Sequence, residues 1–393
     1  MLQAISEQGI AVNLAACSRK EIDTWKRTGV FYCPSCSKPV IIKAGPKVIP
    51  HFAHQSVRNC PSSVGGEGMY HEKGKRLLYR WLHAQHLEVE LEAYLPNIKQ
   101  RPDLLLTING RQIAMEYQCA RISEKQIYSR NKGYIQKGII PIWILGENRM
   151  KRKTAEHLQI DHFSIHLAHK FSSDFPLTLF YFCPHTLQFI MFQDIYFTSA
   201  GLAIGKFSQE RLDKLRLPDI FRVKVYSQQR LFSLWKREKY RFRVRKNRQL
   251  HGKELAWHQW LYLKGKHVEQ LPSLVHLPVP SQYLMNSPPW NWQSRLLIDL
   301  IAPLPQEKEF TLQHCQQFVR LNKTSPSQFP LIKTPGDPVL EYLQLLVEAG
   351  LLSQVRQGVY RKFRQVEYYS HIEQAVAGDD ELMEVLSNRQ KAK

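Results

Sequence analysis

The chain has 393 residues, of which 55 are Lys or Arg and 34 are Asp or Glu, giving a formal net charge of +21. Its length exceeds one typical hydrophobic core, and its 43% hydrophobic and 11% aromatic content excludes a disordered protein. A large excess of positive charge on a globular chain favours a polyanionic partner such as nucleic acid. No run approaches the ~18 apolar residues of a membrane span.

The N-terminal stretch lacks a basic start followed by an apolar core, so no secretory signal is visible. The seven cysteines are an odd number and are unevenly spaced, which favours reduced thiols over a disulfide framework. We therefore expect a cytoplasmic protein.

Residues 1–64 are expected to form an N-terminal zinc-finger-like module, with a strand over 9–14 and a helix over 18–27. The spacing Cys-x₂-Cys followed by further His and Cys is typical of structural zinc sites, which also stabilise modules too small for their own core. Five residues compete for four tetrahedral positions: Cys33, Cys36, His51, His54 and Cys60. The two histidines would face opposite sides of one strand, so both bind only if the chain turns there, and Cys60 is the alternative to His51.

Residues 65–150 show an alternation of helical and strand periodicity. Apolar residues at helical spacing predict a helix over 70–86, and Ser123 can cap a second helix that Gly138 closes. Strands are expected over 87–95, 101–108, 111–119 and 139–145. The predicted order is therefore helix, three strands, helix, strand.

Acidic residues stand inside this predicted sheet. Asp103 begins one strand, a turn at Asn109-Gly110 reverses the chain, and Glu116 lies on the returning strand, with Gln118 on the same face. Antiparallel pairing would bring Asp103 near Glu116, and two converging carboxylates suit Mg²⁺, which activates water for phosphodiester hydrolysis.

The helix before these strands carries two further candidate catalytic residues. His71 and Lys75 are four residues apart and share one helical face, with Glu67 one turn earlier if the helix extends back that far, whereas Glu72 is expected to lie off that face. With Gln118 they complete the proposed catalytic set.

The element order, with Asp103 and Glu116-Tyr-Gln118, resembles the PD-(D/E)xK restriction-endonuclease-like nucleases. Further motifs make the chain similar to the CoiA family of competence proteins: Tyr-Cys33-Pro-Ser-Cys36, His51-Phe-Ala-His54, His71-Glu-Lys-Gly-Lys75, Arg101-Pro-Asp103 and Pro141-Ile-Trp143. The resemblance is specific over about residues 1–150 and looser beyond.

This resemblance implies a protein that acts on incoming single-stranded DNA during natural transformation, in contact with a recombinase and the DNA-uptake machinery. It also implies a nuclease that uses Mg²⁺ or Mn²⁺ held by Asp103 and Glu116. Gln118 stands where such nucleases often have a lysine, and it cannot supply positive charge to the attacked phosphate. The alternative is a nuclease-fold protein that binds DNA and mediates recombination without cleaving it.

Residues 151–250 are expected to form a mixed α/β region that ends in a basic segment. Between residues 222 and 248 the only acid is Glu238, and aromatic residues interleave with the basic ones, a pattern that can neutralise phosphates and stack on unpaired bases. The candidate nucleic-acid contacts are Arg237, Lys239, Arg241, Arg243, Arg245 and Lys246. The alternative is an amphipathic element whose aromatic residues are core.

Residues 251–393 are expected to form a mainly helical C-terminal domain. A possible helix over 311–322, a helix over 337–352 and a hairpin over 353–363 suggest a winged helix, although packing alone explains the same pattern. Its phosphate contacts would be Arg356, Arg361, Lys362 and Arg364, and a transcription regulator is the third functional hypothesis. The expected fold is thus α+β and multidomain: a zinc-binding module, a restriction-endonuclease-like α-β-β-β-α-β core and a mainly helical C-terminal region.

Overall fold

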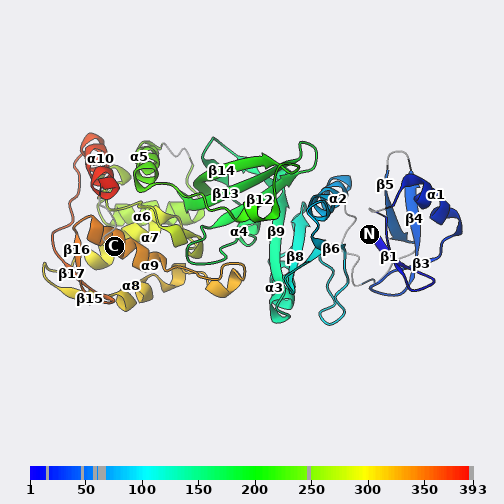
Figure 1. Cartoon of the computed structure of the whole chain (residues 1–393). Coiled ribbons are helices and arrows are strands. Elements are labelled where there is room, and N and C mark those ends of the chain that lie inside the picture. The colour runs from blue at the N-terminus through cyan, green and yellow to red at the C-terminus, as the bar shows by residue number, and fades with distance from the viewer. Residues whose placement is uncertain (15–16, 46–47, 56–59, 61–67, 246–248, 389–393) are drawn as a thin grey trace.

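A computed structural model of the chain describes residues 1–14, 17–45, 48–55, 60, 68–245 and 249–388. The protein is a mixed α+β molecule, with a small N-terminal module at one end, a large sheet in the middle and a mostly helical region at the other end (Figure 1). Within these residues no helix is both long and apolar enough to cross a membrane.

The N-terminal module is a five-stranded sheet of order β2-β1-β3-β4-β5 with one helix packed on β4. Its elements are β1 (Gln3–Ser6), β2 (Ala11–Asn13), α1 (Arg19–Thr28), β3 (Phe31–Tyr32), β4 (Pro39–Gly45) and β5 (Val48–His54). Ser18 and Glu21 form a reciprocal capping box, which fixes where α1 begins. The strand and helix expected at 9–14 and 18–27 are confirmed within one or two residues at each end.

The central region is built on a nine-stranded sheet of order β10-β11-β14-β13-β12-β9-β8-β7-β6. Its first half contains α2 (Met69–His83), β6 (Glu88–Leu91), β7 (Leu104–Ile108), β8 (Arg111–Gln118), α3 (Glu124–Gln136) and β9 (Ile140–Gly146). Its second half contains β10 (Lys151–Arg152), β11 (His157–Gln159), α4 (His162–Ile165), β12 (Thr178–Cys183), β13 (Gln188–Phe197) and β14 (Leu202–Arg211).

Local sequence explains the first half of this sheet. Asn109 and Gly110 both adopt positive φ, 48° and 73°, as a two-residue hairpin requires, so β7 and β8 pair in the expected antiparallel register. Ser123 caps α3 through a capping box, and Gly138 follows it with φ 72°. The expected order of helix, three strands, helix and strand is present.

The second half of the sheet continues the first without a break. Strand β12 pairs in parallel with β9, and β13 and β14 extend the sheet as antiparallel neighbours. Residue 150, the expected boundary between two regions, does not divide the sheet, because the strands on both sides of it belong to one sheet.

The C-terminal region packs around a large apolar core that includes Trp235, Trp257, Trp292 and Tyr342, all at most 1% exposed. Its longer helices are α5 (Gln228–Val244), α6 (Gly252–Leu263), α7 (Pro289–Arg295) with its π-helical continuation (Leu296–Ile301), α8 (Leu312–Phe318), α9 (Pro338–Glu348) and α10 (Ile372–Asn388). A small sheet of order β15-β17-β16 contains β15 (Glu309–Thr311), β16 (Leu352–Arg356) and β17 (Val359–Lys362).

Short 3₁₀ helices connect these elements at Glu147–Arg149, Leu217–Phe221, Val268–Gln270, Pro280–Leu284, Arg320–Asn322 and Pro326–Gln328. The predicted hairpin is confirmed, with Gly358 at φ 71° in its turn, and the helix expected to begin near Asp337 is α9, capped by that residue. The α8–α9–β16–β17 order has the outline of a winged helix, which was the basis of the regulator hypothesis.

Candidate functional sites

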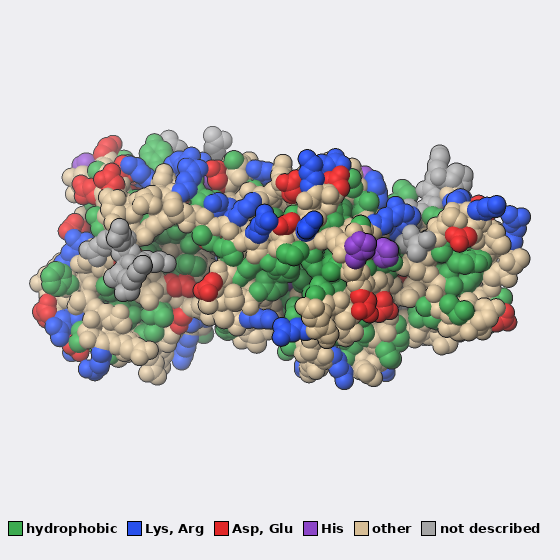
Figure 2. All heavy atoms as spheres, viewed as in Figure 1, with side chains coloured by type: hydrophobic (Ala, Val, Ile, Leu, Met, Phe, Trp, Pro, Cys, Tyr) green, Lys and Arg blue, Asp and Glu red, His purple; other side chains and the backbone are tan. Residues whose placement is uncertain are grey.

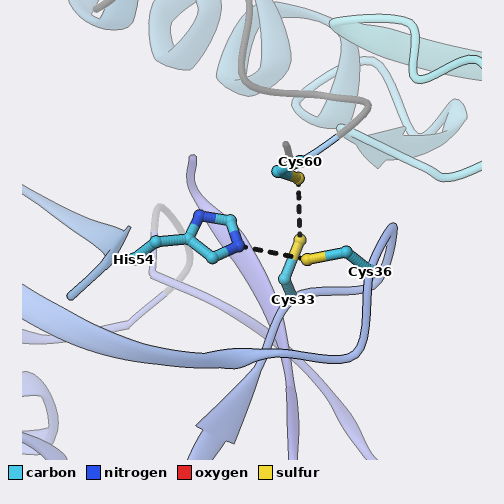
Figure 3. A group of neighbouring side chains, drawn as sticks. All are labelled: Cys33, Cys36, His54 and Cys60. Atoms are coloured by element: carbon cyan, nitrogen blue, oxygen red, sulfur yellow. Dashed lines mark hydrogen bonds between the residues drawn. The ribbon is translucent and has the colours of Figure 1, made fainter. Parts of the chain in front are cut away.

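A group of three cysteines and one histidine lies in the N-terminal module. Cys33 and Cys36 follow β3, His54 ends β5, and Cys60 comes from the segment beyond it. Figure 3 shows all four side chains pointing toward one another, with Cys33 Sγ 3.9 Å from Cys60 Sγ and Cys36 Sγ 3.3 Å from His54 Nε2. Tetrahedral zinc with bonds of ~2.3 Å to sulfur and ~2.0 Å to nitrogen separates such ligand atoms by about 3.5–3.8 Å. The group therefore has the spacing of a metal site.

This arrangement bears on the choice between His51 and Cys60. The ligand atoms that lie within 4.8 Å of one another belong to Cys33, Cys36, His54 and Cys60, and His51 is not among them. His51 and His54 are three residues apart on β5 and so alternate faces, as expected. Burial, together with Lys38, lowers the pKa of His54, which keeps its imidazole neutral and able to bind a metal at neutral pH.

The two acids of the central region lie on neighbouring strands. Leu104 pairs with Met115, so Asp103 and Glu116 are the next residues along the β7–β8 ladder. Asp103 is 9% exposed and accepts a hydrogen bond from the Tyr117 amide at 2.8 Å. The expected antiparallel pairing of the strands that carry these acids is therefore present.

Glu116 is 2% exposed and is held from helix α3. Its Oε1 accepts a hydrogen bond from Arg130 at 2.5 Å and another from the Tyr134 hydroxyl. Burial raises the pKa of Glu116, while the neighbouring guanidinium acts in the opposite direction. Arg130 and Tyr134, four residues apart on one face of α3, were not identified from the sequence, because basic and aromatic residues on a helix are usually surface and core.

Lys75 is completely buried and lies among three carboxylates. Its Nζ is 2.5 Å from Glu92, 3.2 Å from Glu72 and 3.8 Å from Asp103. Glu72 thus shares the face of Lys75, because residues three apart on a helix are neighbours, and the expectation that Glu72 lies off that face was wrong.

Glu92 is an acid that no pattern in the sequence singled out. It follows Glu88 and Glu90 in an alternating run that is typical of a solvated strand face, yet it is 1% exposed. At φ 55° its backbone leaves the strand direction immediately after β6. Its carboxylate also accepts a hydrogen bond from the Leu2 amide at 2.7 Å and lies 3.6 Å from Arg101. The residue before β1 of the N-terminal module therefore contacts this cluster.

His71 lies beside the same acids. Its Nε2 is 3.6 Å from Asp103 Oδ1. Burial alone would lower the pKa of His71, but the Asp103 charge outweighs it and raises the pKa to about 10. The imidazole is therefore cationic at neutral pH, and α2 presents both predicted side chains, His71 and Lys75, to Asp103.

The Gln118 side chain makes a local hydrogen bond near the end of its strand. Its side-chain amide donates to the Ala120 carbonyl at 2.6 Å, at the exposed end of β8. Lys75, from helix α2, supplies the positive charge near Asp103 that residue 118 does not. Glu67, which was considered as a further helix residue, lies outside the described residues.

The predicted nucleic-acid residues divide between the two faces of α5. Lys239 and Arg243 are 0% and 4% exposed and bind Asp379 of α10, at 3.2 and 2.9 Å. Lys239 and Arg243 are four residues apart, so they share one face of the helix, and here that face is buried against α10. Their predicted contact with nucleic acid does not fit this burial. Arg237, Arg241 and Arg245 are exposed, and Lys246 lies outside the described residues.

The winged-helix residues are similarly engaged within the protein. Lys362 is buried and donates to the carbonyls of Ala302 and Leu304, and Arg361 pairs with Glu307 and Glu309. Helix α9, in the place of a recognition helix, exposes mainly Gln344. This packing weakens the regulator hypothesis, since a recognition helix must present several side chains to a DNA groove.

Basic side chains are not confined to one patch. On the face shown in Figure 2, Lys and Arg are spread from the C-terminal region to the N-terminal module and are interspersed with Asp and Glu.

Comparison with known proteins gives a consistent result along the whole chain. Three family models match in order: the N-terminal domain of competence protein CoiA at residues 14–63, its nuclease-like domain at 67–225 and its C-terminal domain at 232–376. The competence protein CoiA of Bacillus subtilis (strain 168) is 28% identical over 337 residues, covering 84% of this chain and 89% of that protein. No solved structure matches. The chain belongs to the CoiA family of competence proteins, and its central region is a nuclease-like domain.

Proposed function

We propose that this protein is a metal-dependent DNA nuclease that acts on incoming DNA during natural transformation. The observation that carries the proposal is the convergence of Asp103 and Glu116 on paired strands with Lys75, whose ammonium is 3.8 Å from Asp103. Two carboxylates beside a cation are the parts that metal-dependent phosphodiester hydrolysis needs. The α2-β6-β7-β8-α3-β9 order supports assigning this core to the restriction-endonuclease-like fold.

The donor set at this site suits a hard cation such as Mg²⁺ or Mn²⁺, since Asp103 and Glu116 offer only carboxylate oxygens. When bound there, such an ion would lower the pKa of a water molecule and neutralise phosphate charge. In this proposal Lys75 takes the part that Gln118 cannot, because an ammonium fixed by Glu92 and Glu72 is already positioned beside Asp103.

A second candidate function is DNA binding without cleavage, in which the protein mediates recombination with a recombinase. The close Arg130–Glu116 pair favours it, because a guanidinium 2.5 Å from the carboxylate occupies one of its oxygens. In this alternative the acids stabilise the fold and the nuclease-like domain serves as a scaffold.

Cleavage assays separate the two functions. Labelled single- and double-stranded DNA are incubated with the full chain across a titration of Mg²⁺ or Mn²⁺. The nuclease proposal expects metal-dependent cleavage that Asp103→Asn reduces by about 10²-fold or more, since a metal ligand is lost while an acceptor for the Tyr117 amide remains. Glu90→Gln, an exposed acid on β6, is the matched control and should cleave like the wild type.

Two results would contradict the nuclease proposal. If the wild type binds DNA but does not cleave it with either ion, or if Asp103→Asn cleaves as the wild type does, the nuclease proposal fails. A transformation assay on the same variants then tests the binding function, which predicts that Asp103→Asn still supports recombinants.

We also propose that the Cys33, Cys36, His54 and Cys60 group holds a structural zinc ion. The spacing of the ligand atoms supports it, as does the small core of this module. Purified protein should contain zinc, and Cys36→Ala should lose one equivalent per chain that Cys17→Ser keeps. Equal zinc content in both variants would contradict this ligand set.

A further inference from the structure

A second cluster of metal-binding side chains lies away from both sites described above. It consists of Glu124 at the start of α3 and of His162 and His166 at the two ends of the short helix α4. Each offers one ligand atom, and these atoms all lie within 4.8 Å of one another. The two histidines are four residues apart and so project from the same side of the turn.

His166 is the informative member of this cluster. It is 4% exposed, and its ring is stacked on Phe329 with centroids 5.0 Å apart and an interplanar angle of 11°. Its Nδ1 bonds to the Gln328 carbonyl at 3.1 Å, which requires that this nitrogen carry the proton. Its Nε2 is then the lone-pair nitrogen, and it is buried without a hydrogen bond among the described residues.

This arrangement is that of a metal-ligating histidine. Such residues almost always donate the other ring N–H to a carbonyl or carboxylate, which fixes the tautomer and aims the free nitrogen at the ion. Here the free Nε2 of His166 faces Glu124, at 3.7 Å from its Oε2, and the other carboxylate oxygen is 2.7 Å from His162 Nδ1. A buried acceptor facing a carboxylate is unfavourable unless a proton or a cation lies between them.

The charged neighbours that the structure describes around this position are engaged elsewhere. Asp161, which also lies next to His162, is already engaged as the cap of α4 and by Arg121 and Arg149, at 3.0 and 3.1 Å. Those arginines are therefore directed to Asp161.

We propose that Glu124, His162 and His166 bind one divalent transition-metal ion of the zinc type. Two imidazoles and one carboxylate select a borderline ion such as Zn²⁺ or Co²⁺ over Mg²⁺. Three protein ligands leave a coordination position open to water, whereas the cysteine-rich group in the N-terminal module supplies four. Gln328 and Phe329, from the C-terminal region, hold the His166 ring and so orient one ligand of the ion.

Metal titration of the full chain tests this site separately from the other two. After the cysteine site is loaded with one equivalent of Zn²⁺, a further equivalent is added and followed by calorimetry, and Co²⁺ is used in parallel for its absorption spectrum. The wild type should bind the second ion, and its Co²⁺ spectrum should lack thiolate charge-transfer bands, because no cysteine is a ligand.

Variants identify the ligands. Glu124→Gln and His162→Gln change exposed side chains and should each weaken the second ion at least about tenfold. His166→Gln should do the same, with circular dichroism as a check on folding. His314→Gln, an exposed histidine elsewhere, and Asp103→Asn, at the proposed nuclease site, should leave the affinity unchanged. If no second ion binds, or if Glu124→Gln and His162→Gln bind it as the wild type does, the proposal is overturned.

Discussion

The cluster around Lys75 and the basic helix α5 both bury cations beside carboxylates, but the first has several carboxylates and the second has one. In the first, the Lys75 ammonium faces Glu72, Glu92 and Asp103. The cationic His71 lies beside Asp103, and Arg101 lies beside Glu92. In the second, Lys239 and Arg243 share Asp379, and Lys239 also donates to the carbonyls of Ser273 and Val275.

The number of carboxylates separates a candidate site from a structural contact. Three carboxylates gathered in one place offer the oxygen ligands that a metal ion needs, so this group suits metal chemistry. Two cations on one acid, completed by backbone carbonyls, attract no second cation and are closed to DNA by burial. Basic composition alone therefore did not separate the buried basic residues of α5 from the exposed ones.

The largest effect is expected from removing the buried ammonium. Lys75→Met leaves Glu72, Glu92 and Asp103 close together without their cation, and should lower the free energy of unfolding by about 3–5 kcal/mol. Urea denaturation followed by circular dichroism measures it. Lys125→Met, at an exposed lysine of α3, should change stability by no more than about 0.5 kcal/mol. Equal effects of the two variants would show that Lys75 does not hold the acids together.

A smaller loss is expected at the α5–α10 contact, where two neighbouring aspartates provide a matched pair. Asp379→Ala leaves Lys239 and Arg243 buried without their acid and should destabilise the protein by about 3 kcal/mol. Asp380→Ala breaks only the half-exposed pair with Lys236 and should cost about 0–1 kcal/mol. If the two variants unfold at the same urea concentration, the burial of this face of α5 is not what stabilises it.

Alkaline pH should act on the two regions with opposite sign. The folded pKa of His71 is raised to about 10, so its stabilising charge is complete below its unfolded pKa of ~6.5 and is lost as pH rises toward 10. Burial lowers the pKa of Lys239 to about 8, below its unfolded value of ~10.4, so between these two values the unfolded chain binds more protons and stability rises with pH.

Unfolding free energies measured from pH 6.5 to 10.5 test both signs. The His71 charge should make the unfolding free energy fall with pH by at most about 1.4 kcal/mol per pH unit, and His71→Gln should remove this fall. The Lys239 charge should make the unfolding free energy rise with pH by at most about 1.4 kcal/mol per pH unit, and Lys239→Met should remove this rise. Slopes that both variants change in the same direction would contradict the contrast between the regions.

The smallest effect concerns the exposed face of α5. If Arg237, Arg241 and Arg245 contact DNA phosphates, each neutralising change to Gln should reduce the slope of log affinity against log salt by about 0.7–0.9. Fluorescence anisotropy with labelled single-stranded DNA measures it. Arg152→Gln, an exposed arginine on β10, serves as the control. A slope unchanged in the triple variant would remove α5 from the DNA-binding surface.

The amino-acid sequence by itself determined the local elements of the nuclease-like core and most of its chemistry. Asn109-Gly110, Ser123 and Gly138 act through backbone geometry and caps, so the hairpin and α3 were predictable from a few neighbouring residues. Spacing on one helix placed His71 and Lys75 on one face, and pairing on one hairpin placed Asp103 beside Glu116.

Only the tertiary structure decided what surrounds those residues. The partners in these contacts are far apart in the chain. Glu92 is 17 positions from Lys75, and Arg130 is 14 positions from Glu116. Asp379 is 140 positions from Lys239. No local pattern encodes such contacts, and the same periodicity suits a solvated face and a buried one. Burial and distant partners therefore decided which charges form a candidate site and which stabilise the fold.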